Sequence, residues 1–140
     1  MPLVDLDAIP QVALPFMNDD HREEARLLNE LADALGAHGA GRATAQAVLQ
    51  AFEALHAHTR DHFWREEEAM RRTGFPPFAI HQAEHARVLA EMEEEGRSFR
   101  EGGDAARLWA YVSEAIPAWF LGHIQTMDLM TSRFVAARGG

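Results

Sequence analysis

Two pairs of residues of the types that bind metal ions lie near the middle of the sequence, on either side of a chain reversal. His62 and Glu66 are four residues apart, and after a Gly-Phe-Pro-Pro segment at residues 74–77, His81 and His85 are again four apart. Residues four apart on a helix lie on one face, so each pair can present two side chains to one point. Two helices that reverse at residues 74–77 would bring the pairs face to face. Converging imidazole and carboxylate groups indicate a metal site.

Four amphipathic segments must position these residues. Apolar side chains recur at steps of three, four and seven, which predicts helices over about residues 18–35, 42–72, 77–100 and 104–135. Asn18, Asp19 and Asp20 supply capping side chains at the start of the first helix, and Pro117 is expected to kink the last helix or leave a carbonyl group unpaired. Short connections favour antiparallel neighbours, so we predict an all-α fold, an up-down-up-down four-helix bundle over residues 18–137.

His21 and His123 also fall on the apolar faces of their helices, so five of the eight histidines are expected in the core together with Glu66. Antiparallel order places all of them toward one end of the bundle, within a layer of ~15 Å at about 1.5 Å per residue. One buried histidine is most often a hydrogen-bonded structural residue. Burying several polar side chains costs on the order of a few kcal/mol each, and a metal offsets that cost for all of them at once.

Five imidazoles exceed what one four-coordinate zinc ion can use, which indicates two metal ions that share carboxylates. Asp128 is the candidate for the second carboxylate, but it lies five residues after His123 and therefore off the inward line of a regular helix. A π-bulge would turn its side chain inward. We therefore predict a π-bulge between His123 and Asp128, and a regular hydrogen-bond ladder there would refute it.

Composition narrows the function classes. The chain has 140 residues, 47% of them hydrophobic, which suits one globular domain. A net charge of −9 argues against nucleic acid or an anionic membrane as a partner, and the lack of cysteine excludes disulfides and thiolate ligands. The apolar residues 1–17 contain prolines and aspartates and lack a basic start, so we expect an extended arm packed on the domain and not a signal peptide. No apolar run reaches a membrane-spanning length, so a soluble protein is expected. The lack of cysteine fits a reducing compartment, so a cytoplasmic location is expected.

The combined pattern resembles the hemerythrin family over about residues 18–134. The resemblance is carried by His21, by His62-Phe63 with Glu66-Glu67, by Gly74-Phe75-Pro76 with His81 and His85, and by Trp119 with His123-Ile124 and Asp128. It implies that two non-haem iron ions bind dioxygen reversibly, with His81, His85 and His123 on one ion and His21 and His62 on the other. Glu66, Asp128 and a solvent-derived oxygen would bridge the ions, and the ion with two histidines would keep an open position.

Three positions depart from the usual family pattern. Phe120 stands where a leucine is common and, if it lines the oxygen pocket, its bulk would alter access or affinity. Phe75 replaces a tyrosine and so lacks a hydroxyl group. The arm also lacks the tryptophan often found there. None of these changes removes a ligand.

Other interpretations use the same residues. His81 to His85 matches the H-x-x-E-H pattern of zinc peptidases, but a peptidase would need further ligands and a substrate cleft. Glu84 is instead expected to face solvent or to support a neighbouring ligand. A ferritin-like oxidase would need a second Glu-x-x-His besides Glu53 to His56. His58 is either a hydrogen-bond donor to a ligand or part of the core edge, and Glu67 and Glu68 are expected in solvent.

We therefore expect an oxygen carrier or store and not an enzyme. A sensor would normally be fused to an output module. The alternatives are a di-iron enzyme or sensor that acts on peroxide, nitric oxide or oxygen, or an iron-handling protein. The expected partner is dioxygen, or else a small anion or nitric oxide.

Overall fold

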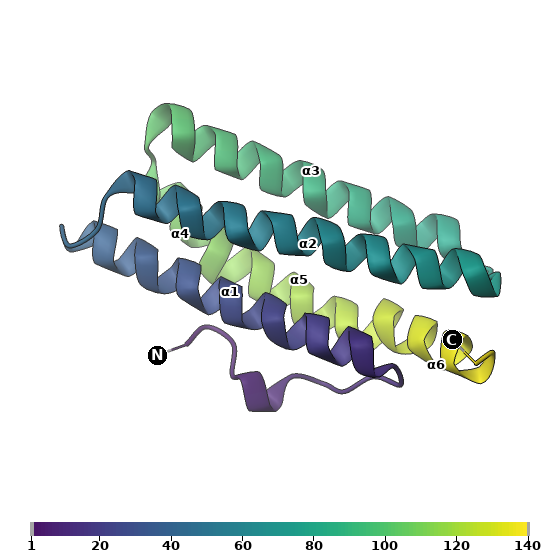
Figure 1. Cartoon of the computed structure of the whole chain (residues 1–140). Coiled ribbons are helices and arrows are strands. Elements are labelled where there is room, and N and C mark those ends of the chain that lie inside the picture. Colours follow the sequence, from purple (N-terminus) through teal and green to yellow (C-terminus); the bar gives the residue numbers. More distant parts are fainter. Residues whose placement is uncertain (1, 140) are drawn as a thin grey trace.

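The computed structural model describes residues 2–139. Three long helices, α1 (Pro15–Gly39), α2 (Ala45–Thr73) and α3 (Phe78–Gly102), are followed by a fourth rod of five consecutive segments. These are α4 (Ala105–Ala110), the π-helical turn η2 (Tyr111–Ala115), α5 (Ile116–His123), the π-helical turn η3 (Ile124–Asp128) and α6 (Leu129–Ala137). The four rods pack side by side and alternate in direction (Figure 1). The predicted all-α antiparallel four-helix bundle is confirmed.

The helix ends follow from local chemistry. Thr44 and Asp104 cap α2 and α4 by accepting hydrogen bonds from the backbone N–H groups of Ala47 and Arg107. Gly74 ends α2 with a φ of 70°, a left-handed conformation that glycine adopts without a steric cost. The short turn after it reverses the chain into α3, as expected from the sequence.

The start of the first helix differs from the prediction. It begins at Pro15 instead of Asn18, because proline is already fixed at a helical φ and loses no intrahelical bond in the first turn. The predicted capping residues therefore lie inside α1. Asn18 instead binds the arm, accepting from the N–H of Val12 at 2.8 Å and donating to its carbonyl oxygen at 3.0 Å. The helix also continues through Gly36 to Gly39, beyond the predicted end at Leu35.

The arm before α1 runs back along that helix (Figure 1) and contains a short 3-10 turn, η1 (Leu6–Ala8). The side chain of Asn29 holds it, accepting from the N–H of Val4 at 3.0 Å and donating to its carbonyl oxygen at 2.9 Å. Apolar arm side chains complete the core beside α1 and the last rod: Val4, Ile9, Val12 and Leu14. An arm is therefore packed on the bundle over residues 2–14, whereas residues 15–17, which were also expected in the arm, belong to α1.

The last helix accommodates Pro117 by a change of helix type. The π-helical turn η2 comes directly before it, and Pro117 then occupies the first turn of α5. Pro117 has no N–H to bond a carbonyl group of the preceding turn, and the π-helical turn, in which the N–H of Ile116 bonds the carbonyl of Tyr111, changes the pairing register just before it. The sequence predicted a break at this point, but not that a π-helical turn would absorb it.

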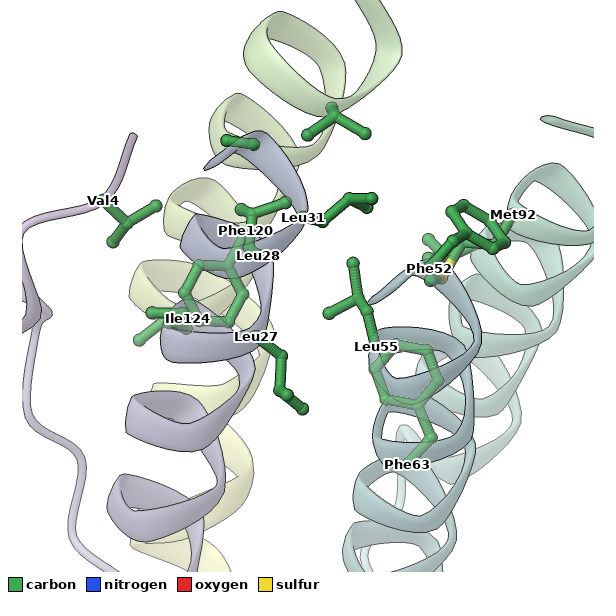
Figure 2. Close-up of a cluster of buried hydrophobic side chains, with 14 of the residues drawn as sticks. Val4, Leu27, Leu28, Leu31, Phe52, Leu55, Phe63, Met92, Phe120 and Ile124 are labelled. Atoms are coloured by element: carbon green, nitrogen blue, oxygen red, sulfur yellow. The ribbon is translucent and has the colours of Figure 1, made fainter. Parts of the chain in front are cut away.

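The apolar core extends along most of the bundle. Figure 2 shows part of it, where Leu28, Leu55 and Phe120 gather from three different rods. These side chains are at most 3% exposed. The histidines and carboxylates lie in the same interior, so they are enclosed by packed hydrocarbon.

Candidate metal centre

The seven residues that the sequence singled out lie in the interior, none more than 7% exposed: His21, His62, Glu66, His81, His85, His123 and Asp128. They come from α1, α2, α3 and, in the last rod, from α5 and η3. Their donor atoms form two groups, and within each group all atoms lie within 4.8 Å of one another. The three-histidine group contains His81, His85 and His123, and the two-histidine group contains His21 and His62. Glu66 and Asp128 belong to both groups.

The two oxygens of Glu66 point to different groups. Its Oε2 lies 2.7 Å from Nε2 of His62 and 3.6 Å from Nε2 of His21. Its Oε1 lies 3.3 Å from Nε2 of His85 and 3.9 Å from Nε2 of His81. One carboxylate therefore offers one oxygen to each group.

The two oxygens of Asp128 also point to different groups. Its Oδ2 lies 2.9 Å from Nε2 of His21, and its Oδ1 lies 3.1 Å from Nε2 of both His81 and His123. The π-helical turn η3 explains how this side chain reaches inward, since an extra residue in one turn rotates the later side chains around the helix axis. The predicted π-bulge between His123 and Asp128 is confirmed.

The donor set fits cations. Several completely buried atoms have no hydrogen-bond partner within residues 2–139, among them Oε1 of Glu66, Oδ1 of Asp128 and Nε2 of His85. Leaving such groups unpaired costs about 1–3 kcal/mol each, and more when they are charged. Imidazole nitrogens and carboxylate oxygens are the ligands that iron and zinc accept. Metal ions in the two groups would satisfy these atoms together.

The electrostatics of the centre also favour positive charge. Burial lowers the pKa of His62, but the carboxylates of Glu66 and Glu24 outweigh it and raise that pKa well above its ordinary value. Burial raises the pKa of Glu66, but the facing imidazoles, His62 first, hold it well below the ordinary value. Two carboxylates in one dry site thus require cations close by, which metal ions would supply.

The three-histidine group is supported by polar and aromatic neighbours. Nδ1 of His81 lies 2.8 Å from the hydroxyl oxygen of Thr131. Nδ1 of His85 lies 2.9 Å from Oε2 of Glu67, whose carboxylate also accepts from Gln82. The expectation that Glu67 is solvated was therefore wrong. Its side chain is only 14% exposed, because it contacts residues of α3. Sequence spacing placed it off the inward line but did not show that α3 covers it.

Aromatic rings fix two of these imidazoles. Phe63 stacks on His85 at 3.8 Å between ring centroids, and Trp119 stacks on His123 at 4.5 Å. The indole N–H of Trp119 donates to Glu84 at 2.9 Å. Glu84 therefore supports a neighbour of the centre and does not occupy the position of a peptidase base. The Glu-x-x-His segment also lies apart, since Glu53 pairs with Arg100 at the surface.

The two-histidine group has neighbours that the sequence reasoning missed. Glu24 of α1 is 7% exposed and its Oε1 lies 3.5 Å from Nδ1 of His62. Thr59 donates a short hydrogen bond to Oε2 of the same carboxylate. Helical spacing could have indicated that Glu24 is buried. It lies three residues after His21 and four before Leu28, so all three residues share one face of α1. His58 contacts the carbonyl oxygen of Asp20 at 3.1 Å and lies 3.5 Å from Glu24, so it borders the centre.

Comparison with known proteins agrees with this geometry. The family model described as the hemerythrin HHE cation binding domain matches residues 12–131. The chain belongs to the hemerythrin family. The curated bacteriohemerythrin of Ralstonia nicotianae is 32% identical over 139 residues, covering 99% of this chain and 93% of that protein. The bacteriohemerythrin of Aquifex aeolicus is 28% identical over 131 residues, covering 94% and 96% of the two chains.

Solved structures extend the comparison of the fold. A crystal structure of a hemerythrin point mutant superposes with a TM-score of 0.84 at 21% identity, covering 96% of this chain and 98% of the other. This hemerythrin chain therefore has the bundle of its family over nearly its whole length. Among the described helices, no stretch is both long and apolar enough to cross a bilayer.

Proposed function

We propose that this chain binds dioxygen reversibly at a non-haem di-iron centre and acts as a carrier or store. His81, His85 and His123 would hold one iron ion and His21 and His62 the other, with Glu66 and Asp128 as bridges. The observation that carries the proposal is the division of each carboxylate, with one oxygen toward the three-histidine group and one toward the two-histidine group. The relatives named bacteriohemerythrin support the same function.

Counting donors identifies where a ligand would bind. The three-histidine group offers three imidazoles and two carboxylate oxygens. The two-histidine group offers two imidazoles and two carboxylate oxygens, so an ion held there would have one protein donor fewer and could accept a small ligand in its place. Ferrous ions would supply the electrons that dioxygen takes up on binding. The protein's part is to hold the ions unequally, so that one of them can accept a small ligand.

Packing around the two-histidine group keeps water from the ligand. The ring of Phe120 meets that of His21 edge to face at 5.9 Å, and Phe120 is 3% exposed. Ile124 is fully buried beside it, and Figure 2 places it next to Phe120. A dry apolar wall disfavours the release of charged oxygen species, because ions are poorly solvated there. Reversible binding requires that the neutral diatomic molecule leave instead.

Visible spectroscopy of the iron-loaded protein tests the proposal. The ferrous protein should gain a charge-transfer band in air, lose it under vacuum, and repeat the cycle. His21→Ala should abolish the band, because it removes a donor from the open ion. His56→Ala is the matched control, since His56 belongs to neither donor group. Rapid irreversible conversion to the ferric form, steady turnover of peroxide, or purification with zinc in place of iron would contradict a carrier or store.

A further inference from the structure

Glu24 is a buried carboxylate that the proposed ligand set does not use. It lies on α1, is 7% exposed, and its Oε1 has no hydrogen-bond partner in the described part of the chain. Two imidazole nitrogens, Nδ1 of His62 and Nε2 of His58, each lie 3.5 Å from this oxygen. Nδ1 of His62 is also buried without a hydrogen-bond partner. Two unpaired polar atoms thus face each other across a gap slightly longer than a hydrogen bond.

The tautomer of His62 decides which atom donates and which accepts in this contact. Nε2 of His62 faces Glu66 and the two-histidine group, so a metal ion there would take the lone pair of Nε2. Nδ1 would then carry the hydrogen and could only donate. Oε1 of Glu24 is the acceptor in front of it, and a shift of a few tenths of an ångström would close the hydrogen bond. The other oxygen of Glu24 is held by the hydroxyl group of Thr59, which fixes the direction of the carboxylate.

Two imidazoles of the three-histidine group already have the kind of partner that His62 lacks. Nδ1 of His81 and of His85 already has a close partner, in Thr131 and Glu67. Nδ1 of His21 has none among the residues that the structure describes. Glu24 is therefore the carboxylate available to orient a ligand of the two-histidine group.

We propose that Glu24 is a positioning residue, which orients the ring of His62 and so controls how firmly the ion of the two-histidine group is held. This inference rests on the proposed function, because it assumes an ion at that position. A carboxylate that accepts from a ligating imidazole fixes the ring and makes its other nitrogen a better donor. Loss of such a partner costs about 10–100-fold in metal affinity. The loss should fall on one of the two ions.

Release of iron to a chelator measures this selectivity without any assay of oxygen binding. Wild-type protein loaded with two ferrous ions should release them in two phases. Glu24→Leu should speed the faster phase about 10–100-fold and leave the slower phase unchanged. Glu24→Gln should lie between, because the amide oxygen still accepts a hydrogen bond but carries no charge. Glu23→Gln is the matched control, since Glu23 is the neighbouring residue and pairs with Arg26 at the surface.

Proton resonances of the cobalt-substituted protein identify the residue concerned. The paramagnetic ion shifts the exchangeable ring N–H signals of its histidine ligands away from all others. Glu24→Leu should shift one such signal and speed its exchange with solvent, whereas Glu67→Gln should affect a different signal. Thr59→Val should move the same signal as Glu24→Leu, but less, because it frees only the far oxygen of Glu24. If Glu24 only stabilised the fold, its substitution would not shift the N–H signal of a single histidine.

The outcomes separate this inference from the proposed function. If the wild-type protein takes up fewer than two ions, the di-iron proposal fails. If it takes up two, but Glu24→Leu and Thr59→Val both leave the release phases and the N–H signals unchanged, the role of Glu24 is refuted. A third ion that binds to the wild type and is lost in Glu24→Leu and His58→Ala would also refute it, because Glu24 would then be a ligand itself.

Discussion

The two halves of the metal centre share two carboxylates but differ in their surroundings. In the three-histidine group, Thr131 and Glu67 hold ring nitrogens, and Phe63 and Trp119 stack on the rings. In the two-histidine group, the carboxylate oxygen of Glu24 that faces Nδ1 of His62 lies 3.5 Å away, and the aromatic neighbour of His21, Phe120, meets it edge to face. One half is held on several sides, and the other is held mainly by the shared carboxylates.

This difference matches the division of labour that we propose. An ion that stays in place needs a full set of fixed donors, because each oriented ligand reduces the entropy lost on binding. An ion that exchanges a small ligand needs a free position and an apolar wall. The bundle supplies the first with polar partners on α2 and α6 and the second with core side chains. Substitutions in each half and removal of the iron test this contrast, from the largest expected effect to the smallest.

Loss of a shared carboxylate should affect both halves, and loss of one imidazole should affect one half. Glu66→Ala should reduce the iron content from two ions per chain to nearly none, because both groups lose a negatively charged donor. His21→Ala should reduce it to about one. Metal analysis after removal of loosely bound iron measures both. If Glu66→Ala keeps one ion, the carboxylate serves a single half and the bridged arrangement is wrong.

Removal of iron should destabilise the whole bundle. An ion present at a thousandfold excess over its Kd stabilises the folded state by about 4 kcal/mol, so the Tm of the metal-free protein should fall by roughly 10–20 °C. Titration of iron back into the metal-free protein should restore most of this difference with the first ion, which we expect to bind the better-supported three-histidine group. Calorimetry at zero, one and two ions per chain tests the order. Equal steps would mean that the two halves bind equally well.

The outer partners of the three-histidine group should control its own ion. Thr131→Val and Glu67→Gln remove or weaken acceptors for the Nδ1–H groups of His81 and His85. Each should lower the affinity for that ion about 10-fold, toward the low end of such effects, because stacking and neighbouring ligands still hold the rings. Competition with a chelator measures the affinity, and Glu68→Gln, at an exposed position beside Glu67, is the control. If these substitutions weakened the faster-released ion instead, Thr131 and Glu67 would not be supports of the three-histidine group alone, and the prediction would be wrong.

Phe120 should set access to the two-histidine group with little effect on metal content. Phe120→Leu removes part of a buried ring beside His21 and should cost about 1 kcal/mol of the free energy of unfolding. The opened space should speed the binding of azide to the ferric protein by a few-fold, measured by stopped-flow absorbance. Iron content should stay at two ions per chain. Unchanged azide kinetics would show that small ligands approach by a path that avoids Phe120.

Much of the fold could be predicted because its signals are local. Helical periodicity gave the four rods, and the Gly-Phe-Pro-Pro segment gave the reversal before α3. The helix start was wrong by three residues, since the capping side chains at residues 18–20 were taken as the start and Pro15 was assigned to the arm. The π-helical turn η3 was predicted only because Asp128 had to reach the centre. No such requirement marked η2, which was missed.

The sequence by itself determined which side chains are buried together, because inward positions on amphipathic helices repeat with the helical period. That was enough to select six of the seven proposed ligands, whereas Asp128, which lies off the inward line, was selected because a second carboxylate was needed. Tertiary structure alone decided how Glu66 and Asp128 divide their oxygens, and that Glu67 and Glu24 turn toward His85 and His62. Such contacts join different helices, so they depend on the rotation and height of one rod against the next. The spacing of residues within a single helix does not determine how that helix is rotated or shifted along its axis relative to its neighbours.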